Sequence, residues 1–292
     1  MPPESVGPVP LLSAARVTVV AGKGGVGKTT VTAVLARAAA AAGRRVLVVE
    51  LDGKSALAEL VGDVDSMALS APAALEEYLR AHGFGRVATR LVSTGVVDVV
   101  STAAPGIDDI VVLGRIKQLE RSGEWDHIVV DGPAAGHAVT MLTAAAGLLD
   151  AVSGGPIRTQ AAEVSDLLHD HERSQVTLVT LPETTPVNEL VETAFTLEDR
   201  VGVRLSPIVV NAVDVGPALP EDLDDLDDLD DEALAGAAAF RNERRRTQAS
   251  ALQRLSAALP LAQLHVPLVP AAHFDAEHIA SLVSSVATRG DS

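Results

Sequence analysis

A glycine-rich string, GKGGVGKTT at residues 22–30, constrains this chain more than any other feature. It fits the pattern of one glycine, four residues of any kind, and then Gly-Lys-Thr. Glycines let the backbone curl so that successive N–H groups point into one cavity, and such a cavity at the start of a helix binds phosphate groups. A short β-branched run at residues 16–21 precedes the string, and a helical pattern opens at Lys28. This context predicts a strand, a phosphate-binding loop and a helix, in that order.

Single positions of the string have separate predicted roles. We expect Lys28 to reach the β- and γ-phosphates of ATP and the Thr29 hydroxyl to ligate Mg²⁺. Lys23, directly after the first glycine, marks the deviant Walker A class, in which this lysine is described as crossing a dimer interface to the partner's nucleotide. The other expected contacts with the nucleotide come from Gly22, Gly24, Gly25, Val26, Gly27 and Thr30.

Acidic residues follow two of the predicted buried strands. Asp131 comes after the run HIVV, and Glu50 and Asp52 come after VLVV. Because parallel strands end at one edge of a sheet, these acids are expected beside the phosphate loop. We predict that Asp131 holds Mg²⁺ through a bound water and that Asp52 orients the attacking water. Whether Glu50 or Asp52 faces the phosphate stays open at this point.

Apolar runs alternate with helical patterns along the rest of the chain. Runs that are apolar on both faces and separated by helices predict a doubly wound, mostly parallel α/β sheet with helices on both faces, the P-loop NTPase fold. We expect one such domain over residues 16–290, after a flexible lead-in at residues 1–15. Strands are predicted at 16–21, 45–51, 86–92, 96–101, 127–130, 176–181, 208–211 and 264–269. Helices are predicted at 28–42, 55–61, 71–82, 107–122, 136–152, 160–169, 186–201, 232–259 and 276–288.

Charge and composition exclude several classes of function. The chain of 292 residues has a formal net charge of −16, and the tract Glu221–Glu232 holds nine acids and no base. We expect a mobile acidic loop at residues 217–232. An acidic chain with 2% aromatic residues does not predict nucleic-acid binding, which needs basic surfaces and stacking platforms. With no cysteine, thiolate metal sites and cysteine nucleophiles are excluded. No signal peptide or run of about 18 apolar residues is evident, which predicts a cytoplasmic protein without stable membrane insertion.

Three segments together resemble the arsenical-pump and tail-anchored-targeting ATPases, the ArsA/GET family. They are GKGGVGKTT, then ELDGKSALAELVG from Glu50, then DGPAAGH from Asp131. The resemblance places Asp52 in the family's switch I segment, and Asp131, Gly136 and His137 in its switch II segment, where residues 132–135 differ from the family pattern. It extends over roughly residues 16–290, strong at the phosphate loop and weaker towards the end.

Later segments carry the same resemblance. Pro105–Asp108 and Leu181–Glu183 look like family segments. An asparagine after a strand contacts adenine in that family, which assigns this role to Asn211. Residues 267–271 lie where the family closes the adenine pocket, which adds Pro270 to the expected nucleotide contacts.

Departures from the family limit what the resemblance implies. The cysteines that hold zinc or metalloid in its members are missing, and residues 136–175 contain a single methionine, Met141, where targeting factors have a Met-rich client groove. The resemblance therefore implies an ATPase switch that uses ATP and Mg²⁺, acts as a homodimer or as a heterodimer with a related chain, and has a reduced region for a protein client. Two alternatives remain: a nucleotide-binding regulatory subunit of a heterodimer, and a MinD/ParA-like positioning ATPase.

Overall fold

A computed structural model describes residues 14–51, 56–81, 83, 106–219, 231–271 and 273–288. Its strands form one seven-stranded sheet in the order β3-β2-β4-β1-β5-β6-β7, and every neighbouring pair is parallel. This confirms the predicted doubly wound α/β fold. The strands are β1 (Val17–Gly22), β2 (Val46–Glu50), β3 (Asp65–Ala68), β4 (His127–Ala134), β5 (Ser174–Thr180), β6 (Ile208–Val213) and β7 (Gln263–Pro267).

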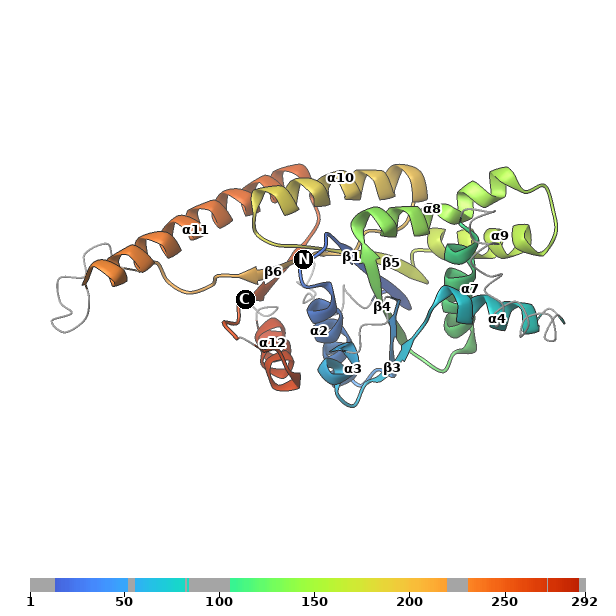
Figure 1. The fold of residues 1–292 in the computed structure, drawn as a ribbon, viewed down its shortest axis with the longest axis horizontal. Coiled ribbons are helices and arrows are strands. Elements are labelled where there is room, and N and C mark those ends of the chain that lie inside the picture. Colours follow the sequence, from blue (N-terminus) through green and yellow to red (C-terminus); the bar gives the residue numbers. More distant parts are fainter. Residues whose placement is uncertain are drawn as a thin grey trace, which may run out of the picture.

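Helices cover both faces of the sheet, as Figure 1 shows. One face carries α2 (Lys28–Ala41), α3 (Ala56–Val61) and α12 (Ala276–Thr288). The other face carries a larger group, with α4 packed on α7. This group consists of α4 (Ala71–Ala81), α7 (Ile107–Ser122), α8 (Ala135–Ala151), α9 (Pro156–His169), α10 (Thr184–Val201) and α11 (Asp231–Ala258).

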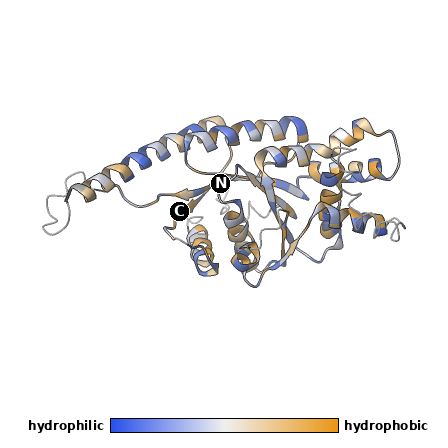
Figure 2. Cartoon of the chain, in the orientation of Figure 1, coloured by the Kyte–Doolittle hydropathy of each residue, from blue (hydrophilic) through white to orange (hydrophobic). Residues whose placement is uncertain are grey.

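The sheet separates two hydrophobic cores. Consecutive side chains of a strand point to opposite faces, so Val19 of β1 packs with the larger helix group while Val20 packs with the smaller one. All six residues of β1 are buried, which agrees with its mostly apolar sequence, VTVVAG. Figure 2 shows long hydrophilic stretches on α11, whereas α8 is largely hydrophobic. None of the helices in the described part of the chain combines the length and the hydrophobicity that a membrane span requires.

The largest differences from the sequence-based expectation concern α9, which begins at Pro156 instead of residue 160, and the strands β3 and β4. β3 was not predicted, because it is a four-residue edge strand whose side chains are mostly exposed and therefore lack an apolar run. β4 was predicted to end at residue 130 but extends to Ala134, so Asp131 lies inside the strand. The strands expected at 86–92 and 96–101 lie outside the described residues.

Candidate nucleotide site

The phosphate loop joins β1 to α2 in a conformation that only glycine accepts at several positions. Gly25 and Gly27 both have a φ of 85°, which L-residues rarely adopt. A Cβ atom on Gly27 would lie 2.2 Å from Nδ2 of Asn211, and one on Gly22 would lie 2.4 Å from the carbonyl oxygen of Val179. The glycines are thus required by the backbone conformation and by the close approach of β5 and β6.

The loop lies where the strand order of the sheet reverses: the connection after β1 leads to one side of the sheet, and the connection after β4 leads to the other. β1 and β4 are neighbours, and the helices that follow them, α2 and α8, lie on opposite faces of the sheet, which leaves a crevice at the carboxyl ends of these two strands. α2 starts there with Gly27 at its N-cap and no side-chain cap. Its first N–H groups and the positive end of its dipole are therefore available to an anion.

Lys28, predicted to contact phosphates, folds back over the loop. Its Nζ atom donates a hydrogen bond to the carbonyl oxygen of Lys23 at 3.3 Å. This contact keeps the ammonium group beside the uncapped N-terminus of α2. The ammonium group and the helix N-terminus are both positive and repel each other, so the negative charge of a bound phosphate would stabilise this arrangement.

Asp131 and Thr29 are brought into direct contact. The Thr29 hydroxyl donates a hydrogen bond to Oδ2 of Asp131 at 2.8 Å, and the Thr32 hydroxyl donates to Oδ1 at 3.1 Å. Asp131 is only 9% exposed, so these two bonds compensate for the loss of water around its carboxylate. The sequence argument missed Thr32, although its spacing of three residues from Thr29 places both on one side of α2.

This pair of oxygen ligands suits Mg²⁺. A hydroxyl and a carboxylate are the hard oxygen donors that Mg²⁺ prefers, and Mg²⁺ is commonly held by one or two protein groups together with substrate phosphates. Within the described ranges, no group of three or more His, Cys, Asp or Glu side chains forms a complete metal site. The residues present therefore fit a Mg²⁺ ion that arrives with a phosphate ligand.

The acid after β2 lies next to Asp131 in the sheet. Glu50 is in register with Asp131 across the β2–β4 pair, and its carbonyl oxygen accepts a hydrogen bond from the Leu69 N–H. Asp52, the predicted water-orienting residue, lies outside the described residues. Ser55 of the switch I segment lies outside them as well.

The expected switch II segment begins within β4 and continues into α8. Gly132 allows a close approach to β1, because a Cβ atom there would lie 2.4 Å from the carbonyl oxygen of Val20. A register shift between Val20 and Gly22 accompanies this approach and explains why β4 continues past Asp131. His137 is exposed on the first turn of α8.

Asn211, assigned to adenine by the resemblance, contacts the phosphate loop itself. Its Nδ2 atom donates a hydrogen bond to the carbonyl oxygen of Val26 at 2.9 Å. The next residue, Ala212, has a φ of 56° and is the one described residue other than glycine with a positive φ. Pro270 is exposed beyond the end of β7, at the same edge of the sheet.

Lys23 points away from the loop towards α10. Its Nζ atom lies 2.6 Å from Oε1 of Glu189, with 43% of the lysine side chain and 41% of the glutamate side chain exposed. Sequence reasoning did not identify Glu189, because 166 residues separate it from Lys23 and no local pattern marks it.

Comparisons with known proteins show the family to which the chain belongs. The family model described as the CobQ/CobB/MinD/ParA nucleotide binding domain matches residues 17–288. ATPase BagA of Mycobacterium tuberculosis is 32% identical over 245 residues, covering 75% of this chain and 72% of that protein. An arsenical pump-driving ATPase of Escherichia coli is 30% identical over 203 residues, covering 65% of this chain and 33% of that protein. The chain therefore belongs to the CobQ/CobB/MinD/ParA family of nucleotide-binding domains.

Proposed function

We propose that this chain binds Mg-ATP and hydrolyses it to ADP and phosphate, as a dimeric ATPase switch of the ArsA/GET type. The observation that carries the proposal is the 2.8 Å contact between Thr29 and Asp131 directly behind the phosphate loop. It joins the two oxygen groups that a Mg-nucleotide site needs. The name of the relative ATPase BagA agrees with this activity.

Each site residue has a defined part in the proposed reaction. Backbone N–H groups of residues 22–30 and the Lys28 ammonium bind the β- and γ-phosphates and stabilise the charge that develops during transfer. Thr29 and Asp131 would hold Mg²⁺, which when bound neutralises phosphate charge. Asp52 orients the attacking water, with Glu50 as the alternative.

The base of the nucleotide is assigned to the β6–β7 side of the crevice. Asn211 uses one N–H on Val26, which leaves its amide oxygen and second N–H for adenine among the described contacts. Pro270 would close the same side. This arrangement links base binding to the position of the phosphate loop.

The proposed dimerisation rests on the expected role of Lys23. In the single chain its ammonium is held by Glu189, so it must leave this carboxylate before it reaches the nucleotide of a partner subunit. Closure of a homodimer or of a heterodimer would then be coupled to ATP, and hydrolysis would reopen it. The region available to a protein client, α8 and α9, is small, and this chain spans 33% of the length of the arsenical pump relative.

The proposal is tested by measuring ATP turnover and molar mass together, with and without Mg-ATP. Lys28→Ala should abolish turnover. Thr29→Val should also abolish it, because the Mg²⁺ ligand is lost, whereas Thr32→Val should retain at least about a tenth of the rate while losing roughly 1–3 kcal/mol of folding stability from one hydrogen bond to a buried carboxylate. Equal turnover in all three variants and the wild type would contradict the assignment of the site.

The two alternatives give different results in the same experiment. A regulatory subunit would bind ATP as a monomer and hydrolyse it only when a related chain is added. A MinD/ParA-like positioning ATPase would co-sediment with liposomes or DNA in the presence of ATP. The altered segment at residues 132–135 supports the regulatory alternative, and the net charge of −16 argues against a DNA-bound positioning ATPase.

A further inference from the structure

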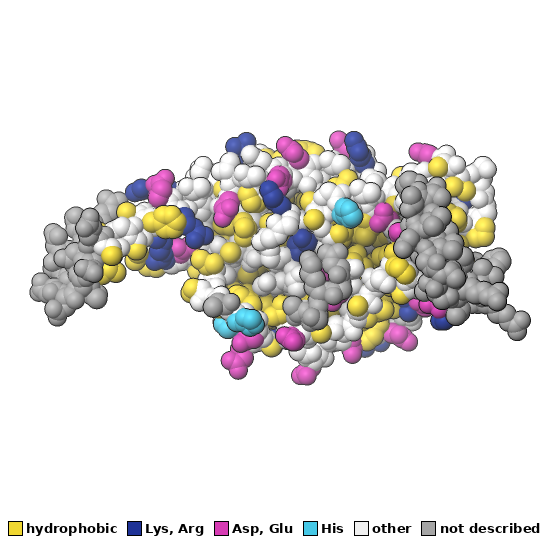
Figure 3. All heavy atoms as spheres, in the orientation of Figure 1, with side chains coloured by type: hydrophobic (Ala, Val, Ile, Leu, Met, Phe, Trp, Pro, Cys, Tyr) yellow, Lys and Arg dark blue, Asp and Glu magenta, His cyan; other side chains and the backbone are white. Residues whose placement is uncertain are grey.

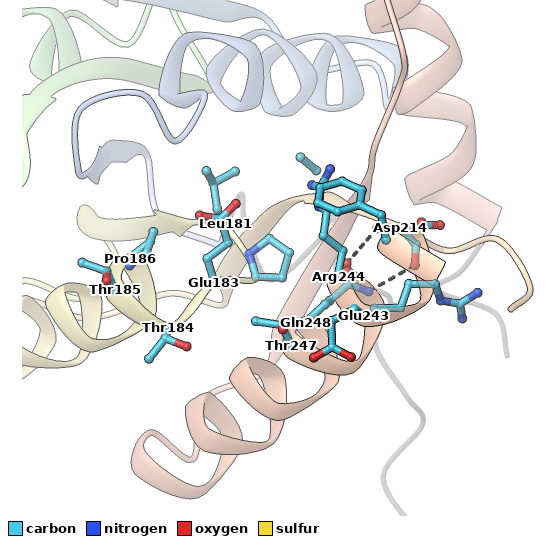
Figure 4. A pocket seen from close by; sticks show the side chains of 14 residues that line it. Leu181, Glu183, Thr184, Thr185, Pro186, Asp214, Glu243, Arg244, Thr247 and Gln248 are labelled. Carbon is cyan, nitrogen blue, oxygen red and sulfur yellow. Dashed lines mark hydrogen bonds between the residues drawn. The ribbon is translucent and has the colours of Figure 1, made fainter. Parts of the chain in front are cut away.

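A second concave site lies beside the phosphate loop, between α10 and α11. The cavity has a volume of about 530 Å³, within the range of small-molecule sites, and opens towards solvent (Figure 4). Its walls come from the β5–α10 junction, the end of β6 and the middle of α11. No residue of the phosphate loop is among the described residues that line it.

The acidic side chains of this cavity are mostly neutralised. Asp214 accepts two hydrogen bonds from Arg241, at 2.8 and 2.9 Å, and this ion pair lowers the pKa of the Asp214 carboxyl to about 2. Glu243 lies 3.1 Å from Arg246. The remaining acid, Glu183, is exposed, so water screens its charge.

Two further arginines of the cavity wall are not bound to an acid by hydrogen bonds. Among the described residues, Arg244 and Arg245 form no hydrogen bond or close ion pair with an acid, although the charge of Arg245 contributes to the lowered pKa of Asp214. The Nη1 atom of Arg245 is buried without a hydrogen-bond acceptor. A buried donor left unsatisfied costs free energy, and a guanidinium is best satisfied by two oxygens of a carboxylate or phosphate. These two arginines place positive charge at the cavity wall of a chain whose net charge is −16.

An aromatic ring stands next to these arginines. Phe240 is 68% exposed and lines the same cavity from the preceding turn of α11. Figure 3 shows hydrophobic and basic side chains side by side where α11 meets the body of the molecule. Thr184 and Thr185 line the opposite wall at the start of α10, an 18-residue helix without a side-chain cap. The cavity thus combines a cationic wall with an apolar surface.

We propose that this cavity binds a small organic anion, namely a phosphate or carboxylate group carried on a flat apolar ring. Arg244 and Arg245 would bind the anionic group, and Phe240 would pack against the ring. Ala212 lines the cavity and directly follows Asn211, which bonds to Val26, so an occupant would lie one residue from a support of the phosphate loop.

The proposal is tested with three probes that share one ring. Phenyl phosphate and benzoate carry the two candidate anions, and phenol is the neutral control. Affinity is measured by NMR titration of the full chain, in the wild type and in Lys28→Ala, whose phosphate loop is disabled. We expect one or both anions to bind saturably to both proteins, and we expect no binding of phenol. The probe with the higher affinity, phenyl phosphate or benzoate, identifies the anionic group that the cavity prefers.

Variants on one helix provide the matched controls. Arg244→Ala and Arg245→Gln should each weaken binding about tenfold or more, because a charge-assisted hydrogen bond is lost. Arg254→Ala removes the same charge from an exposed residue of α11 that does not line the cavity, so it should leave affinity unchanged. Arg244 is exposed, so its variant is expected to fold.

Several results would overturn the proposal. These are the absence of saturable binding by either anion, equal affinity for phenol, loss of binding in Lys28→Ala alone, or equal weakening in Arg254→Ala. The third result would assign the probes to the phosphate loop, and the last would indicate general charge attraction.

Discussion

Asp131 is the residue through which the candidate site is held together. Its two carboxylate oxygens each accept a hydroxyl hydrogen bond from α2, so the strand and the helix that flank the phosphate loop are fixed to each other. A metal ion that replaced the Thr29 contact would leave the Thr32 contact in place. Thr32 is therefore a positioning residue for the carboxylate.

Glu189 is the second residue whose role follows from a contact. Because the ion pair with Lys23 is about two-fifths exposed on each side, its contribution is at most about 1 kcal/mol. Replacing Glu189 with Gln should therefore release Lys23 and raise ATP-dependent dimer formation by up to about fivefold.

Light scattering at several protein concentrations measures this effect, with turnover recorded in parallel. Glu192→Gln, an exposed glutamate one turn further along α10, removes the same charge without touching Lys23. Equal dimer affinities for Glu189→Gln and Glu192→Gln would show that the ion pair does not restrain Lys23.

At the scale of elements, β6 connects the phosphate loop to α11. One end of this connection is the bond from Asn211 to Val26. At the other end, the side-chain amide of Gln248 both donates to and accepts from the backbone of Asp214, and Asn242 does the same with Leu219. The segment after β6 is thus fixed to α11 by paired amide contacts, each of which fits only one register.

Gly27 is the position at which the loop, α2 and β6 meet. Gly27→Ala should destabilise the protein by more than the roughly 1–2 kcal/mol cost of a left-handed alanine, because the new Cβ atom would also displace the Asn211 amide. Gly24→Ala is the matched control, since its Cβ atom would meet no atom within 4 Å.

Urea unfolding without nucleotide separates the two variants. Gly24→Ala should unfold close to the wild type, although it can still impair nucleotide binding. Equal stability of both variants would contradict both the backbone strain expected at Gly27 and the displacement of the Asn211 amide.

At the scale of the whole molecule, the end of the sheet opposite the site is closed by buried polar residues. Glu120, 4% exposed, is held by Arg173 at 2.6 Å and by Arg16 at 3.5 Å. His127 is 1% exposed, and its Nδ1 atom lies 3.0 Å from the carbonyl oxygen of Ala15. These contacts fix the amino ends of the strands, so the carboxyl ends keep their mutual positions.

Burial lowers the pKa of His127 from 6.5 to about 4. Between these values the unfolded chain binds a proton that the folded chain does not, so stability is complete above pH 6.5 and falls as the pH drops towards 4. At pH 5 the loss from this residue would reach up to roughly 2 kcal/mol.

Urea unfolding of the wild type and of His127→Gln at pH 7.5 and pH 5 tests this dependence. The variant should be less stable at pH 7.5 and should lose less stability on acidification. The same loss in both proteins would assign the acid sensitivity to other groups.

The sequence by itself determined the order and type of most elements. Buried parallel strands must be apolar on both faces, so their sequences are distinctive, and the glycine string gave the phosphate loop because few backbones require glycine so often. β3 lacked this signal, since an exposed edge strand has no apolar face. The extension of β4 past Asp131 could not be predicted, because it depends on the close approach of Gly132 to β1.

Only the tertiary structure decided which side chains meet. The bonds from Asn211 to Val26 and from Lys23 to Glu189 join residues 185 and 166 positions apart. The cavity with Arg244 and Arg245 also exists only because α11 returns along the ends of β5 and β6. Local sequence determines secondary structure through short-range sterics and periodicity, whereas contacts between distant segments depend on how the helices pack on the finished sheet.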